Sequence, residues 1–292
     1  MRDTAPDHAL AVASSTRDIR LAATYRVIQS GAQALDNGQA DKALTATSIA
    51  LALLNRTPHE SAADIATCQT LMGRCYLAIG KYQPALDWFK LALPIHLACD
   101  GPRSQSVSAA HSDHGTALLG LDRYEEAAHH FEEAVAIDEA TLGEDHPTTA
   151  RRRVNLGVSY YKADELSSAI RCYSQAMCVT RATLGDDHPE MAAKWNNLGL
   201  AWKAMGEIDL ALSAFEEALA IDRNALAADH PELATTLYNL GITYVSGNNI
   251  DAALDHLSSS YRIRCQRLGT THPHTVDTAL ALDLARQAQR RS

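Results

Sequence analysis

The sequence predicts an all-α solenoid of six helix pairs followed by one capping helix. Three observations predict this fold: a motif that recurs every 42 residues, apolar side chains at helical spacing within each repeat, and a composition poor in glycine, proline and aromatic residues. The 292 residues include 15 Gly, 9 Pro and 5% aromatic residues, too few for the turns and strands of a β-sandwich or β-barrel. Apolar residues make up 46% of the chain, which is enough to build a core.

The repeat is most clearly visible in a six-residue motif that recurs between the predicted helix pairs. It reads LGEDHP at 142–147, LGDDHP at 184–189, LAADHP at 226–231 and LGTTHP at 268–273. In the same register glycine falls at positions 31, 73, 115, 157, 199 and 241, and alanine at 43, 85, 127, 169, 211 and 253. Glycine is scarce in this chain, so one shared register for six of the 15 glycines indicates true repetition of the whole chain.

Each repeat reads as two helices. In the fourth repeat Pro147 suits the first position of a helix, where a missing N–H costs nothing. A second helix is predicted by a buried face at i, i+3, i+4, i+7 and i+10, formed by Leu166, Ala169, Ile170, Tyr173 and Ala176. This helix is expected to end near Leu184, with Gly185 as a left-handed cap. The glycine and alanine columns let the two helices approach closely, and an aromatic column fills the remaining space.

This pattern resembles the tetratricopeptide repeat. The order of small and aromatic residues typical of that family is met at Gly199, Trp202, Ala211, Phe215 and Ala218. The period of 42, in place of about 34, is similar to the lengthened repeats of kinesin light chains and of many bacterial proteins. The resemblance implies one right-handed superhelix over residues 17–292, with residues 1–16 as an N-terminal tail. A polar-faced capping helix is expected at about 273–290.

Composition and motifs argue against several functions. A net charge of -9 disfavours non-specific nucleic-acid binding, and no apolar run is long enough to span a membrane. Six cysteines without regular spacing, and the lack of a secretory signal, predict reduced thiols in the cytoplasm. The chain has no glycine-rich phosphate loop, no nucleophile elbow and no His-Glu-x-x-His motif, so we expect neither an enzyme nor a cofactor.

Two sets of histidines invite a metal hypothesis. The first recurs once per linker, before the helix-starting proline, at His146, His188, His230 and His272. A linker role explains all four. The second set could bring histidines from two neighbouring helices together, and it consists of His111, His114, His129 and His130. His114 occupies the leucine column before the glycine, which favours a core or groove residue, and we expect no metal.

The most informative column lies two residues before each glycine. It contains Gln29, Leu71, Asp113, Asn155, Asn197 and Asn239. Helix propensity does not select asparagine, whereas its amide suits the main chain of an extended peptide. Kinesin light chains and similar proteins hold ligands in a concave groove with such a ladder, and the resemblance implies this role for the three asparagines, continued by Asp113. Alternatively, the asparagines only bond neighbouring first helices and stiffen the stack.

Neighbouring columns complete the predicted groove. Positive charge comes from Arg151, Lys162, Lys194 and Lys203, and apolar contacts come from Tyr161, Leu200 and Tyr238. This combination favours a partner segment with an acidic residue and one or two bulky apolar anchors, although the basic residues could simply be solvated. We therefore expect a non-catalytic adaptor that binds a peptide segment of a protein partner in its concave groove. The alternative is a regulatory subunit that docks an enzyme or self-associates through its convex face or ends.

Overall fold

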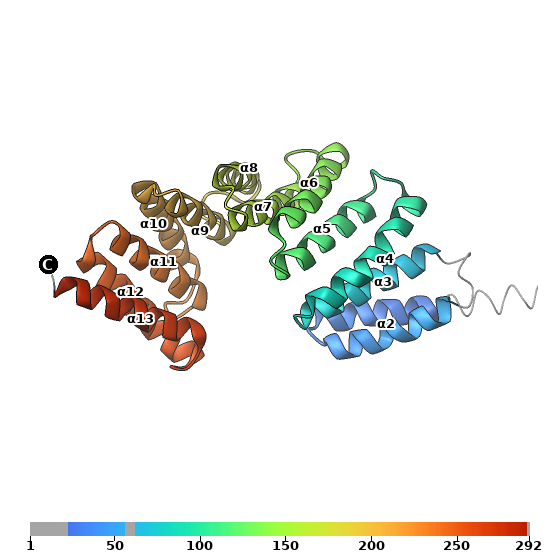
Figure 1. Ribbon diagram of the computed structural model, residues 1–292, viewed down its shortest axis with the longest axis horizontal. Helices are drawn as coiled ribbons and strands as arrows, with labels where there is room; N and C mark the ends of the chain where they lie inside the picture. Colours follow the sequence, from blue (N-terminus) through green and yellow to red (C-terminus); the bar gives the residue numbers. More distant parts are fainter. Residues whose placement is uncertain (1–22, 56–61, 291–292) are drawn as a thin grey trace, which may run out of the picture. The chain divides into compact units, whose positions relative to one another are not determined.

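The computed structural model describes residues 23–55 and 62–290, which are helical throughout apart from short connections and contain no strand (Figure 1). This confirms the predicted all-α solenoid class. Residues 23–36 form the first helix of the described chain. The following helices are α2 (Ala40–Leu54), α3 (Ala62–Ala78), α4 (Tyr82–Asp100), α5 (Gln105–Gly120), α6 (Tyr124–Thr141), α7 (Pro147–Lys162), α8 (Leu166–Leu184), α9 (Pro189–Ala204), α10 (Ile208–Ala225), α11 (Pro231–Ser246), α12 (Ile250–Leu268) and α13 (Pro273–Gln289).

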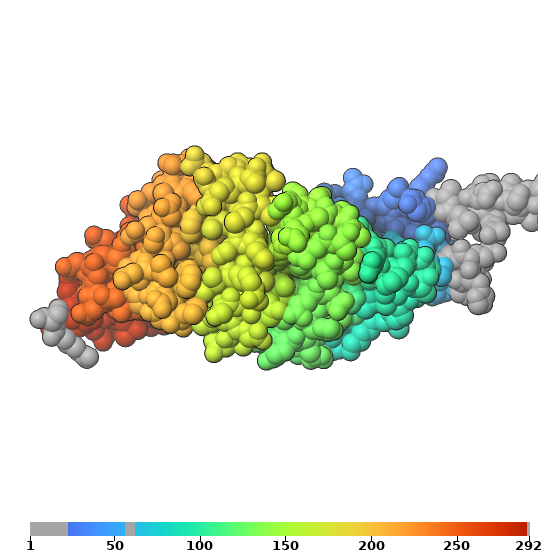
Figure 2. Space-filling view, turned by 90° about the horizontal axis from the view of Figure 1, so that it is seen from above, coloured from blue at the N-terminus to red at the C-terminus, as the bar shows by residue number. Residues whose placement is uncertain are grey.

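The chain forms two compact units, Met1–Thr141 and Leu142–Ser292. In the second unit α7 pairs with α8, α9 with α10, and α11 with α12, while α13 packs on α12 and α11. We call α7, α9, α11 and α13 first helices, and α8, α10 and α12 second helices; successive first helices contact one another. In the space-filling view these repeats follow one another in sequence order (Figure 2). Such nearest-neighbour packing is typical of a solenoid.

The first unit is built in the same way from α3 with α4 and α5 with α6, and α2 packs on α3. A single solenoid over residues 17–292 stays a prediction. The predicted tail at residues 1–16 lies outside the described residues. None of the described helices is long and apolar enough to cross a membrane.

The His-Pro linkers start the first helices of the second unit. In each one the proline is the first helical residue, and the imidazole Nδ1 of the preceding histidine accepts a hydrogen bond from a backbone N–H of the first turn. For His146 the donor is the N–H of Thr148, at 3.1 Å. This N-cap bond satisfies one of the free N–H groups of a helix start. The linker role of the repeated histidines is confirmed.

The glycine column allows close contact between the two helices of a repeat. A Cβ atom placed on Gly199 would lie 2.6 Å from the ring of Phe215, and one on Gly157 would lie 2.6 Å from the ring of Tyr173. Both rings are almost fully buried. The aromatic residue thus fills the space that the glycine leaves, as the sequence predicts. Gly185, expected as a left-handed cap, has a φ of 90° and a ψ of 167°, so its backbone is extended with positive φ and is not left-handed helical. Glycine is the residue that adopts this region readily.

The prediction of a polar outer face on the last helix is wrong. Three apolar side chains on α13 are exposed at 42% for Val276, 59% for Leu280 and 64% for Leu284. They lie four residues apart and so form one stripe. In the 42-residue register Leu284 is equivalent to Ile242 of α11, which is partly buried against the core around α13. The stripe therefore continues the face on which an inner first helix receives the next repeat.

Candidate functional site

A pocket of about 470 Å³ lies between α7, the C-terminal half of α8 and the start of α9. Three of the predicted site residues line it together, namely Arg151, Asn155 and Lys194. Arg151 and Asn155 share one side of α7 because they lie four residues apart. Apolar contact surface comes from side chains of α7 and α8, including Val154, Val179 and Leu184. We call this the α7–α9 pocket.

The two basic residues of the α7–α9 pocket differ in their surroundings. The Lys194 side chain is buried, and its Nζ lies 3.3 Å from Glu190 Oε2 and 3.3 Å from the Glu190 carbonyl oxygen. This ion pair offsets the charge of Lys194. Arg151 is exposed and makes neither a hydrogen bond nor an ion pair within residues 23–55 and 62–290. The guanidinium of Arg151 is thus the cation that can meet a carboxylate from outside.

The three asparagines of the ladder are not equivalent. Asn155 and Asn197 are half-buried, and their side-chain amides make no hydrogen bond in the described part of the chain. Asn239 is buried, and its Nδ2 donates to Asn196 Oδ1 at 3.2 Å. Asn239 therefore joins α11 to α9. This bond fits the alternative interpretation, in which the asparagines bond neighbouring first helices and stiffen the stack. The unbonded amides of Asn155 and Asn197 retain the donors and acceptor that a peptide main chain needs.

The bond of Asn239 belongs to a buried network that the sequence pattern did not predict. Asn196 Nδ2 donates to Thr236 Oγ1 at 2.8 Å, and Thr236 Oγ1 donates to Asp222 Oδ2 at 2.6 Å. Burial raises the pKa of the Asp222 carboxyl, while the hydrogen bond from Thr236 acts in the opposite direction. The only sequence signal was a set of polar residues at positions that face a neighbouring helix. The network ties α9, α10 and α11 together.

Asp113 occupies the ladder position in the first unit. Arg74 Nε donates to Asp113 Oδ2 at 2.9 Å, which joins α3 to α5. This ion pair links α3 and α5, as the bond between Asn239 and Asn196 links α11 and α9 in the second unit. Asp113 lies in a different unit from the three asparagines.

The remaining predicted residues are dispersed over the second unit. Tyr161 packs against the core around α7–α9, and Lys162 is exposed at the end of α7. Leu200 is partly buried against the core of the next repeat. Lys203 is half-buried, and burial lowers the pKa of its ammonium group. The guanidinium of Arg264 lies 4.7 Å from the centre of the Tyr238 ring, so this ring is engaged at the α11–α12 side.

The histidine cluster of α5 and α6 is tightly packed. Nδ1 of His111 lies 3.1 Å from Nδ1 of His130, and the rings of His114 and His130 stack at 4.8 Å with an interplanar angle of 14°. Stacked rings direct their in-plane lone pairs along parallel planes, which does not suit one shared metal ion. Among the described residues no group of three His, Cys, Asp or Glu side chains could hold a metal.

We expect the first unit to lose stability in mild acid. Burial lowers the pKa of His111, His114 and His130, and mutual repulsion helps to bring that of His130 to about 4. A folded-state pKa below the unfolded value of about 6.5 means that this contribution is complete above pH 6.5 and is lost as the pH falls toward 4. Allowing for partial exposure, we expect a loss of roughly 2 kcal/mol.

Urea denaturation of the full chain between pH 7 and 4, followed by backbone circular dichroism and by hydrogen exchange of the α5 and α6 amides, checks this prediction. The variant His130→Gln serves as the matched control, because it removes the group with the strongest depression. Its stability should depend less on pH over the same range. An equal pH dependence in both proteins would contradict the assignment to this cluster.

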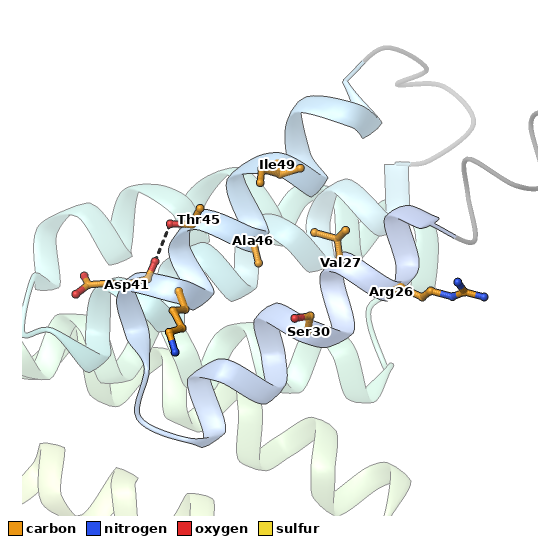
Figure 3. A pocket seen from close by; sticks show the side chains of 8 residues that line it. Arg26, Val27, Ser30, Asp41, Thr45, Ala46 and Ile49 are labelled. Carbon is orange, nitrogen blue, oxygen red and sulfur yellow. Dashed lines mark hydrogen bonds between the residues drawn. The ribbon is translucent and has the colours of Figure 1, made fainter.

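A second pocket, of about 530 Å³, lies in the first unit between residues 23–36 and α2 (Figure 3). Val27, Ala46 and Ile49 give it an apolar lining. Thr45 Oγ1, which also lines it, donates to the carbonyl oxygen of Asp41 at 2.9 Å, within its own helix. None of the predicted site residues lines this pocket, and it is not included in the candidate site.

The tetratricopeptide repeat model matches residues 20–98, 106–182, 153–224 and 190–266. A comparison with curated proteins gave no match.

Among solved structures, BtubC from P. vanneervenii is 20% identical with a TM-score of 0.62, covering 86% of this chain and 94% of that one. A putative kinesin light chain repeat protein from Podosopora anserina is 22% identical with a TM-score of 0.63, covering 70% and 97%. YrrB, described as having an unusual peptide-binding site, is 19% identical with a TM-score of 0.50, covering 80% and 97%. Identities this low show a shared fold alone.

Proposed function

We propose, from the premise that the chain belongs to the tetratricopeptide repeat family, that it is a non-catalytic adaptor that binds an extended segment of a protein partner on the first helices of its second unit. Tetratricopeptide repeat proteins generally mediate protein–protein interaction. The observation that carries the proposal is the α7–α9 pocket, where Arg151 and Asn155 both contribute side chains that have no hydrogen-bond or ion-pair partner among the described residues. We place its action in the cytoplasm, because the irregular spacing of its six cysteines predicts reduced thiols.

Each part of the pocket has a role in this proposal. The amide of Asn155 in the pocket, together with that of Asn197, which lies outside the pocket further along α9, bonds the main chain of the segment, because each amide offers both a donor and an acceptor. Arg151 pairs with an acidic side chain of the segment. The apolar surface around Val154 and Val179 receives a bulky apolar anchor. Contacts of this number and kind correspond to about micromolar affinity.

The test is a capture experiment from source lysate with the full chain as bait. We expect the double variant Asn155→Ala, Asn197→Ala to lose a partner that the wild type retains. The urea midpoint of the double variant should be unchanged, because neither amide makes a hydrogen bond with the part of the chain that the structure describes. The matched contrast is Asn239→Ala, which removes the bond to Asn196 and should lower stability by about 1 kcal/mol.

A partner retained by the double variant would move the interface away from the first helices. It would then favour the alternative function, a regulatory subunit that docks an enzyme or self-associates through the second helices or the ends. The exposed stripe of Val276, Leu280 and Leu284 on α13 is the observation that favours this alternative.

A further inference from the structure

A separate pocket of about 300 Å³ lies at α10, α11 and α12 of the second unit. Arg223 of α10 and Arg262 of α12 line it, and Leu226, Leu237 and Ile263 give it apolar surface. We call it the α10–α12 pocket. Neither arginine makes a hydrogen bond or an ion pair inside the described ranges 23–55 and 62–290, and both are exposed. No Asp or Glu occurs among the described residues that line the pocket.

The preceding repeat supplies an internal comparison for Arg223. In the 42-residue register Arg223 is equivalent to Arg181, whose Nε donates to a carboxylate oxygen of Asp186. The position equivalent to Asp186 is Ala228, which lines the α10–α12 pocket. The repeat that holds the pocket therefore has alanine where the preceding repeat has the aspartate that pairs with the arginine. Arg223 therefore keeps a guanidinium that no neighbouring carboxylate neutralises.

The one carboxylate of the adjoining linker is already engaged. Asp229 pairs with the guanidinium of Arg267, and this hydrogen bond holds the pKa of the Asp229 carboxyl below its usual value. The charge of Arg223 also acts on His256 of α12. Burial is the largest cause that lowers the pKa of His256, and repulsion from Arg223 is the second. Arg262 adds a second cation at a position where the two preceding repeats have Cys178 and Ala220.

Two unpaired guanidinium groups beside an apolar surface form a recognition site for an anion attached to an apolar group. A guanidinium binds a carboxylate through two parallel hydrogen bonds, and it is weakly hydrated, so that it loses little on contact with a partner. The protein carries a net charge of -9, whereas the described residues that line this pocket include two cations and no acidic residue. The local charge of the pocket is therefore opposite in sign to that of the protein as a whole.

We propose that the α10–α12 pocket docks a segment of a partner protein in which a carboxylate side chain lies next to a branched apolar side chain. The carboxylate bonds Arg223 and Arg262, and the apolar side chain rests on Leu237 and Ile263. This surface lies on α10, α11 and α12 and shares no residue with the α7–α9 pocket, so the protein holds two partner segments at once, one on each site.

The test titrates the full chain with the capped peptide Gly-Leu-Glu-Leu-Gly, read through the arginine Nε–H signals in NMR spectra. We expect saturable shifts of the Arg223 and Arg262 signals. Binding should be at least about tenfold weaker for the twin peptide with Gln in place of Glu, and equally weakened in Arg223→Gln and Arg262→Gln. Both arginines are exposed and unbonded, so these variants should keep the wild-type unfolding midpoint.

Two matched variants separate this site from others. Arg181→Gln removes the equivalent but internally paired arginine and should leave peptide binding unchanged. The double variant Asn155→Ala, Asn197→Ala should also leave it unchanged, even if it loses the partner of the α7–α9 pocket. The proposal would be overturned by equal binding of the Gln peptide, by full binding in Arg223→Gln, or by no saturable binding of the Glu peptide. Binding only of a phosphoserine twin would likewise overturn it, because it would assign the pocket to phosphate.

Discussion

Replacing Phe215 with alanine should lower the stability of the second unit by about 3–5 kcal/mol, the usual cost of removing a fully buried aromatic ring. Phe215 has no exposed surface and packs among the core side chains of α10 and α11, including Leu219 and Leu233. The ring also fills the space next to Gly199, so its removal leaves a cavity between α9 and α10. Each repeat is supported mainly by its neighbours, so the loss should spread to α9 and α11.

Urea denaturation of the full chain, followed by hydrogen exchange of the α9 and α10 amides, measures this loss at the repeat concerned. Glu217→Ala is the matched control, because it is an exposed position on the same helix and should change stability by less than about 0.5 kcal/mol. A loss below about 1 kcal/mol for Phe215→Ala would mean that the ring is not a central part of the core.

Replacing Gly199 with valine should be nearly as damaging, through excess volume instead of a cavity. A Cβ atom at this position would approach ring atoms of Phe215 to 2.6–2.8 Å, a separation that requires the helices to move apart. Overpacking of this kind costs about 1–3 kcal/mol, and the branched side chain puts valine at the upper end. Gly199 stands between Asn197 and Leu200 on α9, so the movement should also weaken partner binding.

A double-mutant cycle tests the physical cause. If contact with the Phe215 ring is the problem, Gly199→Val should cost less in a Phe215→Ala background, where the added methyl groups enter the cavity. The two losses would then sum to more than the loss of the double variant. Additive losses would contradict the clash and point to an independent effect of valine on α9.

The repeat architecture could be read from the sequence because its signals are local and periodic. Glycine in one register, an aromatic residue 16 positions later, as in Gly199 and Phe215, and a proline after each linker histidine all act within one repeat. Their structural roles follow from the sterics of a helix pair and from the free N–H groups at a helix start. The same register placed Arg151 and Asn155 on one side of a first helix.

The finer properties of the site could not be read in this way. The periodicity placed Asn155, Asn197 and Asn239 in one column, but it does not tell which amide meets a polar neighbour on the next first helix. Asn196, 43 residues before Asn239, decides that difference. Similarly, Glu190 neutralises Lys194 through a contact that depends on side-chain conformation. Whether such bonds form depends on differences of a few tenths of an ångström in the distance between donor and acceptor atoms on neighbouring helices, which a residue pattern does not encode.

The exposed apolar face of α13 differs from the polar face that the sequence analysis predicts. The last helix was expected to be polar outside because a solenoid end needs to be soluble. Its sequence instead repeats the apolar columns of inner first helices, with Leu280 and Leu284 at positions that face the next repeat elsewhere. Here the register was informative and the general expectation about solenoid ends was not.

The most direct test of the central claim is site-specific photo-crosslinking in source cells. A benzophenone amino acid is placed at Thr148, which lines the α7–α9 pocket, and, as a control, at Gln175, an exposed position on α8. We predict a crosslink from position 148 to one segment of a partner protein, lost in the Asn155→Ala, Asn197→Ala background, and no crosslink to that segment from position 175. Crosslinking of the same segment from position 175 but not from 148 would contradict binding on the first helices.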